Sequence, residues 1–137
     1  MTRSLVAAMP AFAVVRDWVL NIGGGPLVSL ALATNIFQSQ RAGMATILYE
    51  GLPINPDPGI WWALCEQYNV RTMFSSPTAI RVLKKHDADF IHRHDLRALK
   101  YLFLAGEPLD EPTAHWISEA LGKPIIDNYW QTETGWP

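Results

Sequence analysis

Short apolar runs alternate with segments of helical periodicity along most of the chain. The apolar runs have the length of buried strands and cover residues 45–49, 71–75, 99–104 and 123–128. The segments with helical periodicity cover residues 60–68, 78–85 and 110–121. Because strands that alternate with helices favour parallel pairing through right-handed crossovers, we predict an α/β fold with a parallel sheet.

Local signals mark the ends of the predicted helices. Ser76 and Pro77 supply an N-cap and a first-turn proline to the helix at residues 78–85. Gly122 stands at the C-cap position of the last helix. Cys65, the only cysteine, lies midway along the first helix, so we expect a buried thiol and no intrachain disulfide.

Polar loops follow three of the predicted strands, at residues 75–78, 105–108 and 129–133. In a parallel sheet, the loops that follow the strands emerge at one edge, where ligands bind. We therefore expect these loops to converge in space and to form a ligand site.

The stretch at residues 86–95 is polar and contains His92 and His94. Two histidines at this spacing suggest a metal site, whereas the polar neighbours favour a solvated connection. We predict the solvated connection.

Composition narrows the class of protein. The chain has 137 residues, 49% of them hydrophobic and 18% charged, which is typical of one globular domain with a substantial core. A formal net charge of −2 offers no basic surface, so we expect neither nucleic acid nor a membrane as a partner. Proline, glycine and charged residues interrupt the apolar stretches near the N-terminus, and we predict no signal peptide and no membrane span there.

The block at residues 127–137 is the most informative part of the chain. Thr132 and Thr134 offer hydroxyl groups, and Glu133 offers a carboxylate oxygen of the kind that Mg²⁺ prefers. Such groups suit a metal-bound triphosphate. The alternative interpretation is a plain turn after a buried strand, with Trp130 in the core.

These motifs together resemble the AMP-forming acyl-CoA synthetases, the acetyl- and propionyl-CoA synthetase branch in particular. The resemblance covers about residues 42–137 and implies a partial AMP-binding domain, a parallel-sheet subdomain of a larger adenylation domain. The motifs are Tyr49-Glu50-Gly51, Ser76-Pro77-Thr78-Ala79-Ile80-Arg81, Ala105-Gly106-Glu107-Pro108-Leu109 and the block at residues 127–137.

The resemblance also implies roles for individual residues. Thr132 and Glu133 are expected to be catalytic, with Thr132 near the α-phosphate and Glu133 as the ligand of Mg²⁺. Ala105 and Trp130 are expected to line the acyl pocket. The expected nucleotide-binding residues are Gly106, Glu107, Pro108, Asp127, Asn128, Tyr129, Trp130, Gln131 and Thr132.

The implied reaction joins a short-chain carboxylate to the α-phosphate of ATP, expels pyrophosphate and transfers the acyl group to CoA. Acetate-specific relatives tend to carry a larger valine at the position of Ala105, so propionate is expected to be preferred and acetate to come next. The expected partners are ATP or AMP, the carboxylate, CoA and the missing remainder of the synthetase domain, in the cytoplasm. The alternatives are a truncated, non-catalytic nucleotide-binding or interaction module and a plain α/β scaffold.

Residues 1–41 form an atypical segment without a match to this pattern. The family carries a Trp-Val-x-Gly-His segment before the strand at residues 45–49, and here Gly23-Gly24-Gly25-Pro26 lies upstream instead. Codons for Trp-Val-Val-Gly-His, read in a shifted frame, give Gly-Gly-Gly-Pro. Our hypothesis is that this segment is a frame-shifted or mispredicted translation, and we expect the fragment alone to be inactive.

Overall fold

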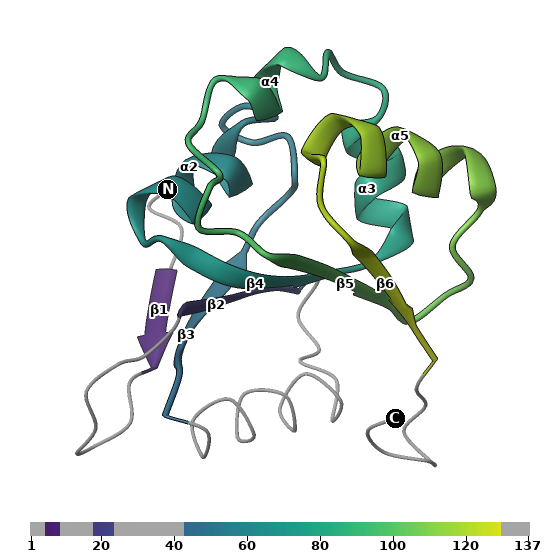
Figure 1. The fold of residues 1–137 in the computed structure, drawn as a ribbon. Helices are drawn as coiled ribbons and strands as arrows, with labels where there is room; N and C mark the ends of the chain where they lie inside the picture. Colours follow the sequence, from purple (N-terminus) through teal and green to yellow (C-terminus); the bar gives the residue numbers. More distant parts are fainter. Residues whose placement is uncertain (1–4, 9–17, 24–42, 130–137) are drawn as a thin grey trace.

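The computed structural model describes residues 5–8, 18–23 and 43–129, which form a twisted sheet with helices on one face (Figure 1). The strands are β1 (Leu5–Ala8), β2 (Trp18–Gly23), β3 (Ala45–Glu50), β4 (Val70–Ser75), β5 (Tyr101–Ala105) and β6 (Ile125–Asn128). The helices of the described part are α2 (Ile60–Gln67), α3 (Pro77–Leu83), α4 (Asp89–His92) and α5 (Glu111–Leu121).

The strands follow the order β1-β3-β2-β4-β5-β6 across the sheet. The pairs from β3 to β6 are parallel, and β1 alone among the described strands pairs antiparallel, with β3. The structure thus confirms the predicted α/β fold. Ser75 at the end of β4 is in register with Leu104, and Ala105 at the end of β5 is in register with Asn128. The carboxyl ends of β4, β5 and β6 therefore lie side by side.

The core lies between the sheet and the helices. Leu102 and Leu104 of β5 are fully buried on this side, against Ile80 of α3 and Ile117 of α5, which are also fully buried. Burial of each such side chain stabilises the fold by about 1.5–3 kcal/mol relative to exposure. Cys65 belongs to the same core, and burial raises the pKa of its thiol to about 12, so the predicted buried cysteine is confirmed.

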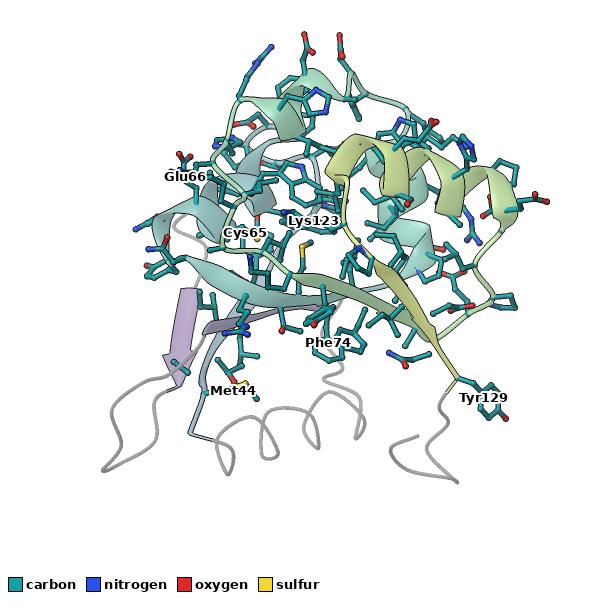
Figure 2. The ribbon with its side chains drawn as sticks, viewed as in Figure 1. Met44, Cys65, Glu66, Phe74, Lys123 and Tyr129 are labelled. Carbon is teal, nitrogen blue, oxygen red and sulfur yellow. The ribbon has the colours of Figure 1, made fainter. Side chains whose placement is uncertain are left out.

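The opposite face of the sheet carries aromatic side chains. The rings of Phe74 and Phe103 stack with their centroids 4.7 Å apart, and Tyr101 meets Phe103 edge-on at 6.3 Å. Figure 2 shows Cys65 on the helix side of the sheet and Phe74 on the other side. Apolar side chains on both faces are typical of parallel strands, which are usually covered on both sides.

The predicted helix ends are confirmed by the capping geometry. The Ser76 hydroxyl accepts a hydrogen bond from the Ala79 amide at 3.3 Å, and Pro77 begins α3. Gly122 ends α5 with a φ of 59°, a conformation in which glycine carries no side-chain penalty. No helix in the described ranges is long and apolar enough to cross a membrane.

The prediction for residues 86–95 was incomplete, because the connection contains the short helix α4. Its residue Ile91 is only 3% exposed and packs into the core, a single anchor too small to produce a periodic pattern. His92 Nε2 lies 3.0 Å from the Ala120 carbonyl oxygen, and His94 Nδ1 lies 2.8 Å from Glu66 Oε2. The two histidines therefore connect the segment around α4 to α5 and to α2. Among the described residues, no group of three or more histidine, cysteine, aspartate or glutamate side chains could hold a metal ion.

Candidate functional site

Two of the three predicted loops meet at the carboxyl edge of the sheet. The loop after β4 leads into α3, and the backbone N–H of Thr78 there donates to Glu107 Oε1 of the loop after β5, at 2.7 Å. The two residues are 29 positions apart in the sequence. The predicted convergence is thus confirmed for these loops. The third loop begins at Tyr129, directly after Asn128, which ends β6 beside Ala105. Its remaining residues, 130–133, lie outside the described part of the chain.

One arginine holds the loop at residues 106–108 in place. Arg81 Nη1 donates to Glu107 Oε2 at 3.0 Å, and Arg81 Nη2 donates to the Pro108 carbonyl oxygen at 2.9 Å. Arg81 Nε donates to Asp110 Oδ2 at 2.6 Å. We call Arg81 and these three partners the Arg81 clamp. It joins α3 to the loop after β5 and to the N-cap of α5.

Hydrogen bonds to the two carboxylates of the clamp favour their ionised forms. Hydrogen bonding from Thr78, and then from Arg81, holds the pKa of Glu107 below its ordinary value. The pKa of Asp110 is likewise lowered, by hydrogen bonding from Thr113 and then from Arg81. Both carboxylates are therefore charged at neutral pH, which keeps the clamp closed.

The loop at residues 106–108 turns its middle side chain inward and its flanking residues outward. Glu107 is half-buried against α3, whereas Gly106 and Pro108 are exposed. Gly106 has a φ of +99°, which other residues rarely adopt, and a Cβ built there would meet nothing within 4 Å. The glycine is therefore required by the backbone conformation, and the space beside it is open to a ligand.

Ala105 and Asn128 lie together beside this loop. Ala105 is 8% exposed and is in register with Asn128. Since side chains alternate along a strand and Leu104 faces the core, Ala105 lies on the opposite face, the one that carries Phe103. Tyr129, which follows, is 69% exposed. The small side chain of Ala105 thus lies at the end of β5, directly before the loop at residues 106–108.

The described part of the predicted site is therefore assembled at one place. The structure brings together Ala105, Gly106, Glu107, Pro108, Asp127, Asn128 and Tyr129 at the carboxyl ends of β5 and β6. The predicted residues Trp130, Gln131, Thr132 and Glu133 lie outside the described residues. Sequence reasoning assigned no role to Arg81, although this residue ends the motif at residues 76–81, or to Asp110, which directly follows the motif at residues 105–109. The only signal was the presence of an arginine and an acid at the ends of these two motifs.

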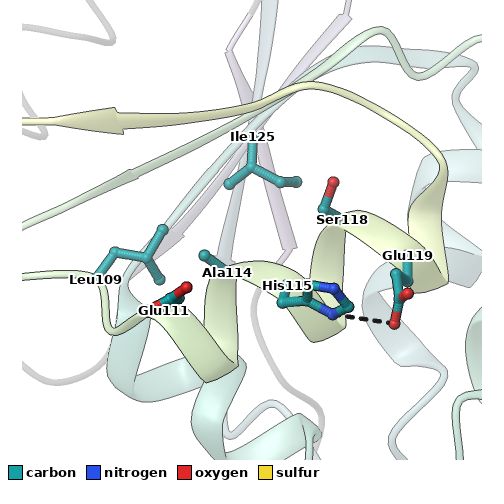
Figure 3. Close-up of a pocket in the computed structure, with 7 residues that line it drawn as sticks. All are labelled: Leu109, Glu111, Ala114, His115, Ser118, Glu119 and Ile125. Carbon is teal, nitrogen blue, oxygen red and sulfur yellow. Dashed lines mark ion pairs between the residues drawn. The ribbon is translucent and has the colours of Figure 1, made fainter.

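A surface pocket of about 450 Å³ lies elsewhere, between α5 and β6 (Figure 3). His115 Nδ1 and Glu119 Oε2 form an ion pair at 3.1 Å on its rim, and both side chains are 71% exposed. An exposed pair of this kind contributes little to stability. The pocket contains none of the predicted site residues; its lining consists of Leu109, Glu111, Ala114, His115, Ser118, Glu119 and Ile125.

Comparison with known proteins decides the family. A family model described as AMP-binding enzyme matches residues 21–137. The chain belongs to the AMP-binding enzyme family. The predicted resemblance is thereby confirmed.

The relatives of this AMP-binding chain are much longer than the chain itself. The propionate–CoA ligases of Salmonella typhimurium and Escherichia coli are 67% and 66% identical to it over 102 residues. An acetyl-coenzyme A synthetase of Rhodobacter capsulatus is 40% identical over 96 residues. The aligned regions cover 74% of this chain and 16% of the two ligases, and 68% of this chain and 15% of the acetyl-coenzyme A synthetase. The chain thus spans about one sixth of the length of these relatives.

Proposed function

We propose that residues 42–137 form part of the adenylation domain of an AMP-forming short-chain acyl-CoA synthetase. The enzyme joins propionate, or less readily acetate, to the α-phosphate of ATP and then transfers the acyl group to CoA. The observation that carries this proposal is the hydrogen-bonded meeting of the Thr78 and Glu107 loops beside the end of β6. The edge at which strands of a parallel sheet end is where such folds bind nucleotides. The high identity to propionate–CoA ligases supports the choice of substrate.

The nucleotide lies along the loops after β5 and β6. The exposed Gly106 and Pro108 offer their backbone to the adenine and the ribose, and Asp127 accepts from the adenine amine. Both carboxylate oxygens of Glu107 are engaged by α3, so Glu107 acts by fixing the loop rather than by touching the ligand with its side chain. The surface continues through Asn128, Tyr129, Trp130, Gln131 and Thr132.

The phosphates lie beyond the end of β6. Thr132 donates its hydroxyl to the α-phosphate, where negative charge increases during the attack of the carboxylate. Glu133 supplies the carboxylate that holds Mg²⁺, a hard cation that prefers such oxygens. When bound, Mg²⁺ neutralises charge on the phosphate oxygens and so favours the departure of pyrophosphate.

The acyl group of the substrate lies between Ala105 and Trp130. The small side chain of Ala105, on the face opposite the core, leaves space for the terminal methyl group of propionate. A pocket that discriminates by one methylene gains about 10- to 200-fold in specificity. Propionate is therefore the preferred substrate and acetate the next.

The remaining assignments concern the rest of the chain. The boundary at residue 42, the frame-shifted origin of residues 1–41 and a cytoplasmic location with access to ATP and CoA belong to the same proposal, whereas the family match itself begins at residue 21. Sequencing the gene tests the first two: a synthetase-like reading in another frame upstream of the Arg41 codon is expected. If no frame contains one, the frame-shift hypothesis is wrong.

A chimeric enzyme tests the function directly. In this chimera, residues 42–137 replace the homologous segment of the Salmonella typhimurium propionate–CoA ligase. We expect AMP formation that depends on propionate, ATP and CoA, and none from the 137-residue chain alone, which spans 16% of the ligase. A folded but inactive chimera, together with AMP binding by the isolated chain, would instead support the non-catalytic nucleotide-binding module.

A further inference from the structure

We infer that Arg81 is a positioning residue that holds the loop at residues 106–108 in the conformation that receives the nucleotide. This role rests on the function proposed above, which places the nucleotide against that loop. Arg81 would thus support adenylation although its side chain contacts the loop and not the ligand.

The guanidinium group is suited to this task by its geometry. Its three nitrogens donate in three directions, and their acceptors are a side chain, a backbone carbonyl and the N-cap of the following helix. Arginine presents its donors in a rigid plane, so three simultaneous contacts fix orientation as well as distance. A lysine, with one ammonium group, cannot satisfy the acceptors on Glu107, Pro108 and Asp110 together.

The clamp connects an exposed loop to a helix that is anchored in the core. Helix α3, which carries Arg81, is anchored in the core by Ile80 and Leu83, which are 0% and 3% exposed. The loop itself contains the exposed Gly106, with its unusual φ, and has no buried apolar anchor of its own between Gly106 and Pro108. Arg81 therefore transmits the fixed position of α3 to the loop.

The side chains of the clamp are partly exposed to solvent, so its role in positioning the loop can be distinguished from a role in stabilising the fold. The side chains of Arg81, Glu107 and Asp110 are 36%, 34% and 41% exposed. Ion pairs this open to water contribute little to global stability. Their directional contacts still restrict the loop, so loss of Arg81 should affect nucleotide binding more than folding.

The test uses Arg81→Ala and Arg81→Lys in the chimera, with Arg97→Ala as the matched control. Arg97 pairs with Asp95 before the amino end of β5, away from the loop. For both Arg81 variants we expect the KM for ATP to rise about tenfold while kcat changes by no more than about threefold, because misplacement weakens binding in both ground and transition states. Arg97→Ala should leave both constants unchanged. An unchanged KM for ATP in folded Arg81→Ala would overturn the inference.

A double-mutant cycle tests whether Arg81 acts through Glu107. Glu107→Gln retains an acceptor for Thr78 and removes the charge that Arg81 holds. If the two residues act together, the double variant should raise the KM for ATP by clearly less than the product of the single effects. If the KM for ATP of the double variant instead rises by the product of the two single effects, Arg81 does not act through Glu107. This cycle also applies if Arg81→Ala fails to fold, since Arg81→Lys then takes its place.

Asp127→Ala distinguishes failure of this inference from failure of the proposed function. If Asp127→Ala raises the KM for ATP and the Arg81 variants do not, the nucleotide site stands and the positioning role is wrong. If none of these variants affects the KM for ATP, the nucleotide does not lie on these loops and the proposed site falls as well.

Discussion

Replacement of Ala105 by valine in the chimera tests the proposed acyl pocket most directly. Ala105 is the last residue of β5, is 8% exposed and lies in register with Asn128, on the sheet face opposite the core. Valine adds two methyl groups without disturbing the backbone, since β-branched residues fit extended strands well. The added volume should occupy the space proposed for the terminal methyl group of propionate.

The size of the effect follows from the packing. Overfilling a packed site costs about 1–3 kcal/mol. If this cost falls on the propionate complex and spares acetate, the ratio of their kcat/KM values should move towards acetate by about tenfold or more, because each 1.4 kcal/mol corresponds to a factor of ten. Trp130→Gly should act in the opposite sense and favour longer chains.

The assay is kcat/KM for acetate, propionate and butyrate, with Ala45→Val as the matched control. Ala45 begins β3 and is fully buried, so valine there also overfills the protein, at the amino end of a strand. We expect Ala45→Val to lower stability without changing the ratio between substrates. If Ala105→Val also leaves the ratio unchanged, Ala105 is a packing residue and the preference for propionate loses its structural basis.

Three further predictions concern the metal, the cysteine and the clamp. Glu133→Gln in the chimera should slow pyrophosphate release and raise the Mg²⁺ concentration required, because the amide lacks the charge that a hard cation needs; an unchanged Mg²⁺ dependence speaks against the assignment. Cys65 should resist thiol reagents in the folded chain, and rapid labelling of the native protein would contradict its burial. Because burial raises the pKa of this thiol from 9.0 to about 12, its contribution to stability is present below about pH 9 and is lost as pH rises towards 12. The pKa values of Glu107 and Asp110 are lowered from 4.5 and 3.8, so their contribution to stability is present above these values and is lost as pH falls. Because these groups are open to water, Arg81→Ala and the parent should differ only slightly in their free energy of unfolding by urea at neutral pH, and the difference should narrow further in acid; a constant difference would mean that the clamp is not ionic.

The elements of the fold were predictable because their signals are local. Ser76 and Pro77 stand at the start of α3, and Gly122 stands at the end of α5, as their residue types favour. The burial of a side chain predicts less reliably whether its residue belongs to a paired strand. Leu99 is 1% exposed and was assigned to a strand, yet β5 begins at Tyr101, because a side chain can enter the core before its backbone joins the sheet.

The convergence of the strand ends was predictable, whereas the orientation of the side chains there was not. Parallel pairing places the ends of β4, β5 and β6 at one edge, so the motifs that follow these strands had to converge there. Which atom of each motif faces a ligand depends on contacts between residues far apart in the sequence. Glu107 illustrates this, since it bonds to Thr78, 29 positions away.

The clamp explains why two motifs that seem independent in the sequence belong together. The segment that begins at Ser76 supplies a helix N-terminus and Arg81, and the segment that begins at Ala105 supplies the carboxylate that both engage. A carboxylate at a helix N-terminus is favoured by the free N–H groups and the helix dipole. Loss of Arg81 or of Glu107 alone deprives the other residue of this charged partner. The loop at residues 106–108 is therefore held by the helix after β4, and the two strand ends act as one unit at the edge of the sheet.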